Sequence, residues 1–493
     1  MYVSRRVDAG APESRDGGDS HAAWRTPVRP RRARGRGSGV PFRDTFRESR
    51  RRSASGGPAP IYRGHEHLGG MAAWYAAGVH EPMVRFAADP PATADVVIIG
   101  GGIVGCATAF FAARAGLRAL VLERRAALGT LTTSASTGAF RLQFDNPEEI
   151  AMVREGIELF DAFAERSGLD GWDLGLRHGG YLFCSLTDAT LERSRRLVVR
   201  QREWGLTDVA LLSGDEARGR WPWLSADVRG ARYRSDDGWL DVKRLTAGYA
   251  AAASHAARIP DATPGGGATF VTRAEVTGIA HDGERVSGVR TSRGEVATDA
   301  VVVAAGPFVA GVAALAGVEV AIRPTRRQKL VIPQLPAVPP DAPMTIEEET
   351  AAHWRPSMQG CLALFTDPAE RPAEPCDPVP IDHDWAFGLL DPGSEHALAR
   401  VAPFWRDAWV GGASAVHWFL QAGQYEYTPD RRPYLGPIGP DGLHLNGGYS
   451  GHGIMAGAGG SRLVVDLLTG RADRDTNAFR PDRAFDHREH DIL

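Results

Sequence analysis

The chain has 493 residues, of which 43% are hydrophobic and 24% are charged, as in an ordinary folded protein with a large core. Its formal net charge of −3 excludes a chain that binds nucleic acid through overall positive charge. No apolar run reaches about 18 residues, so we expect no membrane span. The four cysteines lack metal-ligand spacing, and we expect reduced thiols in a cytoplasmic protein.

Residues 1–93 are predicted to form a disordered N-terminal extension. Residues 1–60 are rich in arginine, glycine, proline and serine, without a periodic apolar pattern, so they bury too little surface to offset the entropy of ordering. Two alternatives stay open: a basic arm for nucleic acid or acidic partners, and translated upstream sequence with Met71 as the start. A twin-arginine export signal is disfavoured because no apolar stretch follows Arg5 and Arg6.

Residues 95–123 are predicted to form a βαβ unit that binds a dinucleotide. Residues 95–99 are a short β-branched run typical of a buried parallel strand. An apolar helix follows at residues 103–115, and the second strand is expected at residues 118–122. Glu123 ends that strand, where its carboxylate can accept both ribose hydroxyls and disfavours a 2′-phosphate.

The turn between the first strand and the helix has the spacing Gly-x-Gly-x-x-Gly. Gly100 makes the tight turn, Gly102 lets the backbone approach a pyrophosphate, and Gly105 lets the helix and the strand pack closely. The helix N-terminus offers N–H groups and a positive dipole end to the phosphates. The expected cofactor contacts of this unit are Gly100, Gly102, Ile103, Val104, Gly105, Glu123 and Arg124.

Further motifs follow in the second half of the chain. A β-meander is expected at residues 271–298, and the strand at residues 299–306 ends in small residues that could lie against a cofactor. Near the end, residues 423–430 precede a Gly-rich turn at residues 443–453, which continues into a helix at residues 454–468.

These motifs together resemble the D-amino-acid oxidase superfamily, most closely its sarcosine oxidase and dimethylglycine dehydrogenase branch. The most specific are Ala304-Ala-Gly306, Tyr427-Thr-Pro-Asp430 and Tyr449-Ser-Gly-His-Gly453. The resemblance implies a mixed α/β (α+β) fold: a glutathione-reductase-type Rossmann FAD-binding domain with an interleaved, mainly antiparallel β-sheet substrate domain. We expect the FAD-binding domain at residues 94–175, 226–320 and 431–475, the substrate domain at residues 176–225 and 321–430, and a C-terminal tail at residues 476–493.

The resemblance also implies how FAD is held and what binds the substrate. The C-terminal Gly-rich turn would point N–H groups at the N1–C2=O edge of the flavin, where negative charge grows as a hydride reaches N5. Further implied cofactor contacts are Val276, Ala305, Gly306, Gly448, Gly451, His452, Gly453 and Ile454. Arg141 is expected to hold a substrate carboxylate, unless it is a surface or domain-bridging arginine. Tyr425 would border the substrate cavity, as could Arg355. His452 is a candidate base, although its neighbours favour a backbone role.

Three departures from the family pattern bear on the chemistry. Gly423 stands where monomeric sarcosine oxidases have the cysteine that attaches the flavin, so FAD should be non-covalent. Met455 replaces a lysine, and the strand at residues 361–365 lacks the lysine that promotes reaction with oxygen. Lys329 is the only lysine that could approach. A slow reaction with oxygen is therefore expected.

The leading hypothesis is an FAD-dependent dehydrogenase or oxidase of an amino acid or N-methylated amine, whose imine product hydrolyses. Its partners would be that small molecule and an electron acceptor, namely oxygen, a quinone or an electron-transfer protein, with no nucleic acid and no metal. Two alternatives stay open. One is a dehydrogenase of 2-hydroxy acids or polyols with the same fold. The other is a flavin-bearing assembly factor, because the family includes a mitochondrial one with a similar Arg-x-Gln-Phe stretch.

Overall fold

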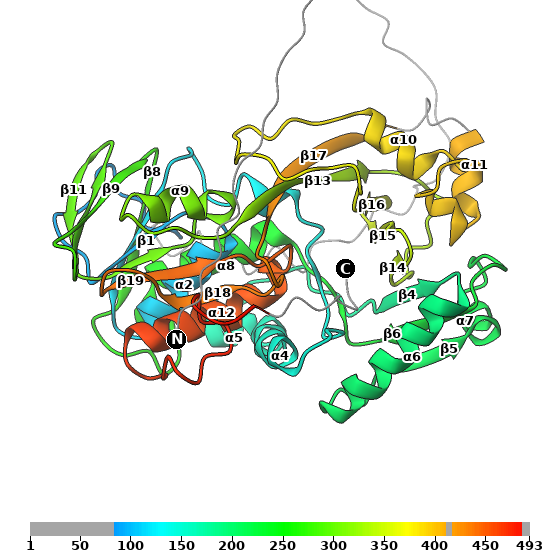
Figure 1. Ribbon diagram of the computed structural model, residues 1–493, viewed down its shortest axis with the longest axis horizontal. Coiled ribbons are helices and arrows are strands. Elements are labelled where there is room, and N and C mark those ends of the chain that lie inside the picture. Colours follow the sequence, from blue (N-terminus) through cyan, green and yellow to red (C-terminus); the bar gives the residue numbers. More distant parts are fainter. Residues whose placement is uncertain (1–82, 411–416, 486–493) are drawn as a thin grey trace, which may run out of the picture. The chain divides into compact units, whose positions relative to one another are not determined.

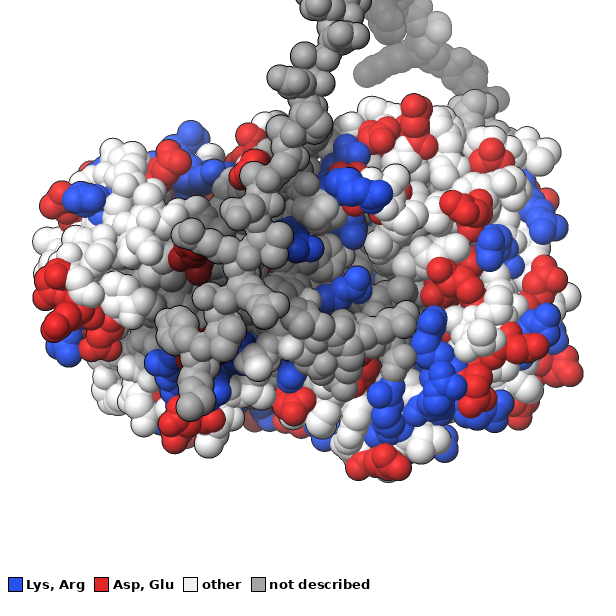
Figure 2. All heavy atoms as spheres, in the orientation of Figure 1, with Lys and Arg blue, Asp and Glu red and all other residues white. Residues whose placement is uncertain are grey.

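The computed structural model describes residues 83–410 and 417–485 (Figure 1). The described residues belong to one compact unit. Within the described part, the strands form a six-stranded sheet, an eight-stranded sheet and two smaller sheets. On the face drawn in Figure 2, acidic and basic side chains are interspersed over the coloured surface, so neither sign dominates there.

The six-stranded sheet is built around the predicted βαβ unit. Its order is β18-β19-β12-β1-β2-β8, and β1 pairs in parallel with both β2 and β12. The residues of β1 are nearly all fully buried, as expected for a strand covered on both faces. The strands are β1 (Val96–Ile99), β2 (Arg118–Glu123), β8 (Gly267–Thr272), β12 (Val301–Val303), β18 (Tyr434–Pro437) and β19 (Leu443–Gly447).

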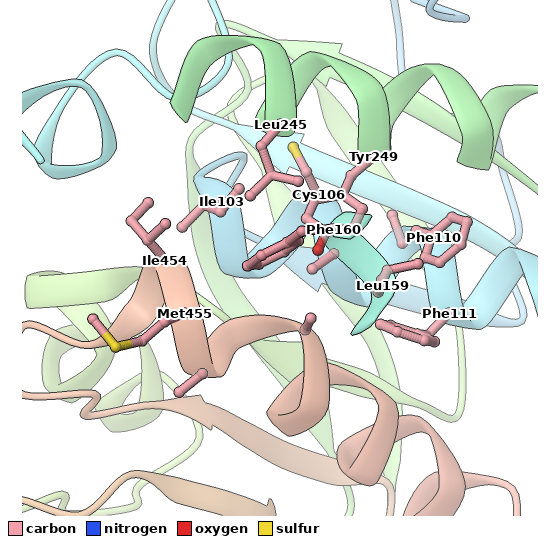
Figure 3. Close-up of a cluster of buried hydrophobic side chains, with 14 of the residues drawn as sticks. Ile103, Cys106, Phe110, Phe111, Leu159, Phe160, Leu245, Tyr249, Ile454 and Met455 are labelled. Atoms are coloured by element: carbon pink, nitrogen blue, oxygen red, sulfur yellow. The ribbon is translucent and has the colours of Figure 1, made fainter. Parts of the chain in front are cut away.

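One face of this sheet carries a helical layer (Figure 3). Its helices are α2 (Ile103–Arg114), α4 (Pro147–Asp161), α5 (Phe163–Ser167), α8 (Val242–Ser254) and α12 (Gly453–Leu468). Apolar side chains of α2, α4, α8 and α12 meet in one core, which includes Phe110, Phe160, Leu245, Tyr249 and Ile454. Helices from distant parts of the sequence therefore share a single buried layer.

The other face is covered by a small antiparallel sheet and a short helical segment. The sheet contains β9 (Val276–His281), β10 (Val286–Thr291) and β11 (Gly294–Ala297), which confirms the predicted meander. The helical segment contains η2 (Gly306–Phe308) and α9 (Val309–Ala314). Valines of β1, β12 and α9 pack together here, so apolar side chains cover both faces of β1.

The eight-stranded sheet has the order β17-β13-β16-β15-β14-β4-β6-β5 and is antiparallel except between β14 and β4. Its strands are β4 (Tyr181–Ser185), β5 (Ala210–Ser213), β6 (Gly230–Arg234), β13 (Arg323–Ile332), β14 (Met344–Glu347), β15 (His353–Ser357), β16 (Gly360–Leu364) and β17 (Phe419–Tyr427). The accompanying helices are α6 (Asp188–Glu203), α7 (Gly214–Arg220), α10 (Asp384–Leu390), η3 (Leu398–Arg400) and α11 (Phe404–Val410). This second sheet confirms the expected mixed fold with a mainly antiparallel part.

The boundary predicted at residue 226 is wrong. Strand β6 follows that boundary, yet it pairs with β4 and β5 in the eight-stranded sheet. The chain returns to the first sheet only after β7 (Gly238–Trp239), which pairs with β3 (Ala139–Phe140). Asp241 then caps α8 by accepting from the N–H groups of Lys243 and Arg244. Strand β6 was therefore assigned to the wrong sheet.

Both predicted terminal segments are partly folded. The extension predicted for residues 1–93 includes residues 83–93, and the N–H of Ala87 donates to the carbonyl of Phe270 at 2.9 Å, so the boundary at residue 93 is too late. In the predicted tail, Phe479 is buried and Arg483 pairs with Asp430 at 2.8 Å. The predictions for residues 1–82 and 486–493 lie outside the described residues. Among the residues that the structure describes, the helices are too short or too polar to cross a membrane.

Candidate functional site

A cavity lies at the carboxyl ends of the parallel strands, where open α/β sheets bind their ligands. Ile99 ends β1, Glu123 ends β2, and Ala304 follows β12, and all three line the cavity. The predicted cofactor contacts that line it are Gly100, Gly102, Ile103, Val104, Glu123, Arg124, Val276, Ala305, Gly306, Gly451, Gly453 and Ile454. Segments that are more than 300 residues apart in sequence therefore meet around one space.

Three predicted contacts have other positions. Gly105 does not line the cavity, because an added Cβ would lie 1.8 Å from the carbonyl oxygen of Gly100. Its role is the predicted close packing of helix on strand. Gly448 has a φ of +74° and an added Cβ would meet Thr428, so it shapes the turn. His452 does not line the cavity either, and its ring turns toward Arg141.

Two helices direct uncapped N-termini at the cavity. α2 begins after Gly102 and α12 begins after His452, and neither helix has a side-chain cap or an acidic residue in its first turn. Around Gly102 an added Cβ would meet only the Thr133 hydroxyl, at 3.4 Å, so the backbone there is accessible to a ligand. Two positive dipole ends therefore face the same space, as an anionic ligand requires, although the N–H of Ile103 donates to the Thr133 hydroxyl at 3.1 Å.

Glu123 is fixed at the edge of this space. One carboxylate oxygen accepts from the N–H of Gly101 at 2.8 Å, and the other accepts from the N–H of Arg125 at 2.7 Å. Both contacts hold the carboxylate beside the glycine turn. It stands where a ribose next to a bound diphosphate would present its hydroxyls.

Several walls of the cavity were not predicted. They comprise the loop after β2 with α3 (Thr132–Ala135), the segment from Pro307 to Leu315, residues Asn446 and Gly447, and the side chains Arg125, Glu275, Pro375 and Glu426. The first two groups follow parallel strands directly, so the strand-end rule could have identified them. Pro375 and Glu426 come from the part of the chain that builds the second sheet, and no local pattern marks them.

A strap at residues 373–378 crosses to the cavity from the second sheet. Asp377 forms ion pairs with Arg124, at 3.0 Å, and with Arg125. Gln424 of β17 accepts from the N–H of Cys376 at 2.8 Å, and Pro375 reaches the cavity wall. Arg124 lies at the cavity as predicted, but its guanidinium binds the strap.

Arg141 and His452, predicted separately, lie in contact. Arg141 is only 3% exposed, and its Nη2 is 3.2 Å from Nε2 of His452. The same guanidinium donates to the carbonyl of Gln143 at 3.0 Å and lies 4.6 Å from the Phe144 ring centre. Tyr425, the third predicted residue, lines the cavity and packs against Gly451. Arg141 and Tyr425 therefore flank the same C-terminal turn.

Asp237 fastens the loop that carries Arg141. The carboxylate of Asp237 is fully buried and accepts from the N–H of Leu142 and from Nε2 of Gln143, both at 2.9 Å. Arg234 donates to the same carboxylate at 2.7 Å. Burial raises the pKa of Asp237, while these three donors act in the opposite direction.

Two buried cations of the second sheet hold the preceding part of the loop. Lys329 donates to the carbonyls of Ser134, at 3.1 Å, and Ser136, at 2.7 Å, and burial lowers its pKa to about 7. Arg355 donates through Nε to the carbonyl of Thr137 at 2.8 Å. Neither cation lines the cavity. The sequence suggested that Arg355 could face the cavity, and it does not. Lys329 contacts the carbonyl of Ser136, which does line the cavity.

The comparison with family models decides the assignment. The model described as "FAD dependent oxidoreductase" (DAO) matches residues 95–467. The chain belongs to this family of FAD-dependent oxidoreductases. The match spans both sheets and the whole cavity, and it confirms the predicted resemblance.

The similar proteins lie in the predicted branch and its neighbours. Human mitochondrial sarcosine dehydrogenase is 28% identical over 407 residues, which is 79% of this chain and 41% of that protein. The chain thus spans less than half the length of that relative. Glycine oxidase of Pseudomonas aeruginosa is 26% identical over 382 residues, covering 76% of this chain and 95% of that protein. The structure of L-proline dehydrogenase from P. horikoshii shares the fold, with a TM-score of 0.68 and 23% identity over 80% of this chain and 98% of that chain.

The residues present fit FAD. The accessible backbone at Gly102 and the two uncapped helix N-termini suit a diphosphate, and the tethered Glu123 suits a ribose. Among the residues that the structure describes, no group of His, Cys, Asp and Glu could hold a metal ion.

We predict that Asp237→Ala will destabilise the protein by about 3–5 kcal/mol, because it leaves Arg234 and two N–H donors without their buried acceptor. Urea denaturation of the holoprotein measures the loss. Asp236→Ala is the matched control, since its side chain is 65% exposed and lies 3.7 Å from Arg234. The control should change stability by less than about 1 kcal/mol. Equal losses in the two variants would contradict the role given to Asp237.

Proposed function

We propose that this protein oxidises the C–N bond of an amino acid or an N-methylated amino acid, with FAD as the hydride acceptor. The observation that carries the proposal is the buried Arg141 beside the turn that begins α12. A guanidinium in that position suits a substrate with a carboxylate, because its planar fork matches two carboxylate oxygens. The names of the relatives, sarcosine dehydrogenase and glycine oxidase, agree with this substrate class.

Each protein group has a defined part in the proposed reaction. Arg141 holds the carboxylate and so orients the C–H bond, and burial strengthens the charged contact because little water competes. His452 positions the Arg141 guanidinium, and the Phe144 ring packs against both groups, with its centre 5.0 Å from that of the His452 ring and 4.6 Å from Cζ of Arg141. Tyr425 borders the substrate. FAD, held by the glycine turn, Glu123 and the N-termini of α2 and α12, would supply the hydride acceptor, and the imine product would hydrolyse in water.

The substrate class is tested by anaerobic reduction of the purified holoprotein, followed through the loss of flavin absorbance. The panel contains sarcosine, dimethylglycine, glycine and proline, with 2-hydroxy acids and N-methylamines without a carboxylate as contrasts. Reduction by the amino acids alone is expected. Reduction by hydroxy acids alone, or equal reduction by amines that lack a carboxylate, would contradict the proposal.

Arg141→Lys should slow reduction by the best substrate about 10- to 150-fold, because lysine keeps the charge but loses the bidentate fork, which costs roughly 1.5–3 kcal/mol. FAD affinity should change less than about threefold. Stopped-flow reduction and FAD titration measure the two quantities. The exposed Arg285, paired with Asp441, supplies the control Arg285→Lys, which should behave as wild type. An unchanged reduction rate in Arg141→Lys would assign this arginine a structural role.

We also propose that FAD is bound non-covalently. Gly423 has no side chain to attach a flavin, and an added Cβ would lie 3.0 Å from Cα of Thr132, so a larger residue does not fit there without movement. Acid precipitation of the holoprotein should therefore release all the FAD into the supernatant. Yellow colour that stays with the precipitated protein would refute non-covalent binding.

The proposed electron acceptor is not oxygen. A fixed positive charge beside the reduced cofactor favours electron transfer to oxygen. The cations that line the cavity among the described residues are Arg124 and Arg125, and both are paired with Asp377, while Lys329 lies behind Ser136. After anaerobic reduction, the enzyme should be reoxidised more slowly by air-saturated buffer than by a dye or quinone. Fast reoxidation by oxygen that accelerates as the pH falls through about 7 would instead identify protonated Lys329 as the oxygen-activating group.

A further inference from the structure

A second carboxyl group in the cavity wall has no role in the functions described above. Glu426 stands near the end of β17 and is 9% exposed. It lines the same cavity as Tyr425, Asn446 and Gly451. Among the ion pairs of the described residues none involves Glu426, so no cation compensates this buried group.

The C-terminal turn holds Glu426 in place. Its backbone carbonyl accepts from the N–H of Ser450 at 3.3 Å. Glu426 is thereby held beside the turn that leads into α12, whose first residues line the cavity. A cofactor in this cavity lies within the field of the group.

The surroundings of Glu426 offer little positive charge. Tyr425 and Tyr427 flank it on its own strand, and Tyr449 faces it from the turn. On the adjacent strand β13, the guanidinium of Arg327 lies over the rings of Tyr425 and Tyr427, at 5.9 and 5.4 Å, and donates to the Tyr427 hydroxyl.

The remaining walls of the cavity add negative rather than positive charge. Glu123 and Glu275 contribute two further carboxyl groups, and the arginines of the lining are paired with the strap. FAD brings a diphosphate, so an ionised Glu426, which is only 9% exposed, would add like charge to the same cavity. Like charges in a low dielectric favour the neutral form of an acid.

We propose that Glu426 is part of the FAD site and enters the complex as a neutral carboxylic acid. The proton comes from solvent, so binding to the ionised protein consumes one proton per FAD. Burial already raises the pKa of Glu426 to about 7 in the protein, with the hydrogen bonds from backbone N–H groups acting in the opposite direction. Bound FAD raises the pKa further. Below pH 7 the carboxyl of Glu426 is therefore already protonated in the free protein. Above pH 7 the protein must take up one proton each time it binds FAD.

The sign of the pH dependence follows from this linkage. Above the pKa of the free protein, the affinity for FAD falls about tenfold per pH unit, until the pKa of the complex is reached. Below pH 7 the affinity is flat. This behaviour concerns cofactor binding alone, so it can be measured without any substrate and fails independently of the proposed substrate class.

The test is a titration of the deflavinated full-length protein with FAD between pH 6 and pH 9, followed by fluorescence. Wild type should lose roughly 10- to 100-fold in affinity between pH 7 and pH 9. Glu426→Gln carries a neutral amide of the same shape, so it should keep its pH 6 affinity up to pH 9. Glu295→Gln removes an exposed carboxyl of β11 that does not line the cavity, and it should retain the wild-type affinity and slope.

Three results would overturn the proposal. One is a flat profile in wild type, and another is an unchanged slope in Glu426→Gln. The third is a folded Glu426→Gln protein that fails to bind FAD at pH 6.

A measurement on wild type alone covers the case in which the variant does not fold. Calorimetric titration with FAD at pH 8, in two buffers of different ionisation enthalpy, should report uptake of about one proton per FAD, and no uptake would refute the neutral acid.

Discussion

The cavity depends on backbone contact between three segments at the end of β1. An added Cβ at Gly105 would lie 1.8 Å from the carbonyl oxygen of Gly100, and one at Gly100 would lie 2.5 Å from that of Ala304. Such distances leave no room for any side chain, so glycine is required at both positions. The contact fixes where α2 starts relative to β1 and β12. Its N-terminal N–H groups consequently face the strand ends, and the other cavity walls are arranged around that point.

A second constraint connects the two sheets through the loop from residue 134 to residue 144. Its carbonyls accept from Lys329 and Arg355 of the second sheet, and Asp237 accepts from its later N–H groups. Lys329 and Arg355 thus bind backbone carbonyls, whose position they define, while Asp237 also pairs with Arg234. Ser136 lines the cavity and Arg141 lies beside the C-terminal turn, so one loop sets the distance between the cavity and the arginine proposed to hold the substrate.

Short sequence patterns were sufficient to predict the elements whose structure depends on residues that are neighbours in the chain. The strand and helix of residues 95–123, the meander and the helix after Gly453 were all predicted near their observed bounds, because apolar periodicity and glycine spacing act over a few residues. Strand β6 was misassigned because its partners β4 and β5 are chosen by pairing, which one segment alone does not encode. The ion pair of Arg124 with Asp377 spans 253 residues and had no sequence signal at all.

The candidate site likewise contains residues that the sequence could predict and residues that it could not. The glycines and Glu123 were predictable because each position of a βαβ turn has a fixed task, whereas Glu426 is one polar residue within an ordinary strand pattern. Only the assembled cavity reveals that its carboxyl meets the cofactor space. There the charge balance becomes unusual. Asp377 pairs with both arginines of the lining but offsets only one of their two charges, and the N-termini of α2 and α12 each add about half a positive charge, against the carboxylates of Glu123 and Glu275 and the diphosphate. Two such ends roughly offset one negative charge, which leaves no surplus for an ionised acid. In a site that holds an anion partly through helix dipoles, a buried carboxyl without a cation beside it, such as Glu426, favours its neutral form.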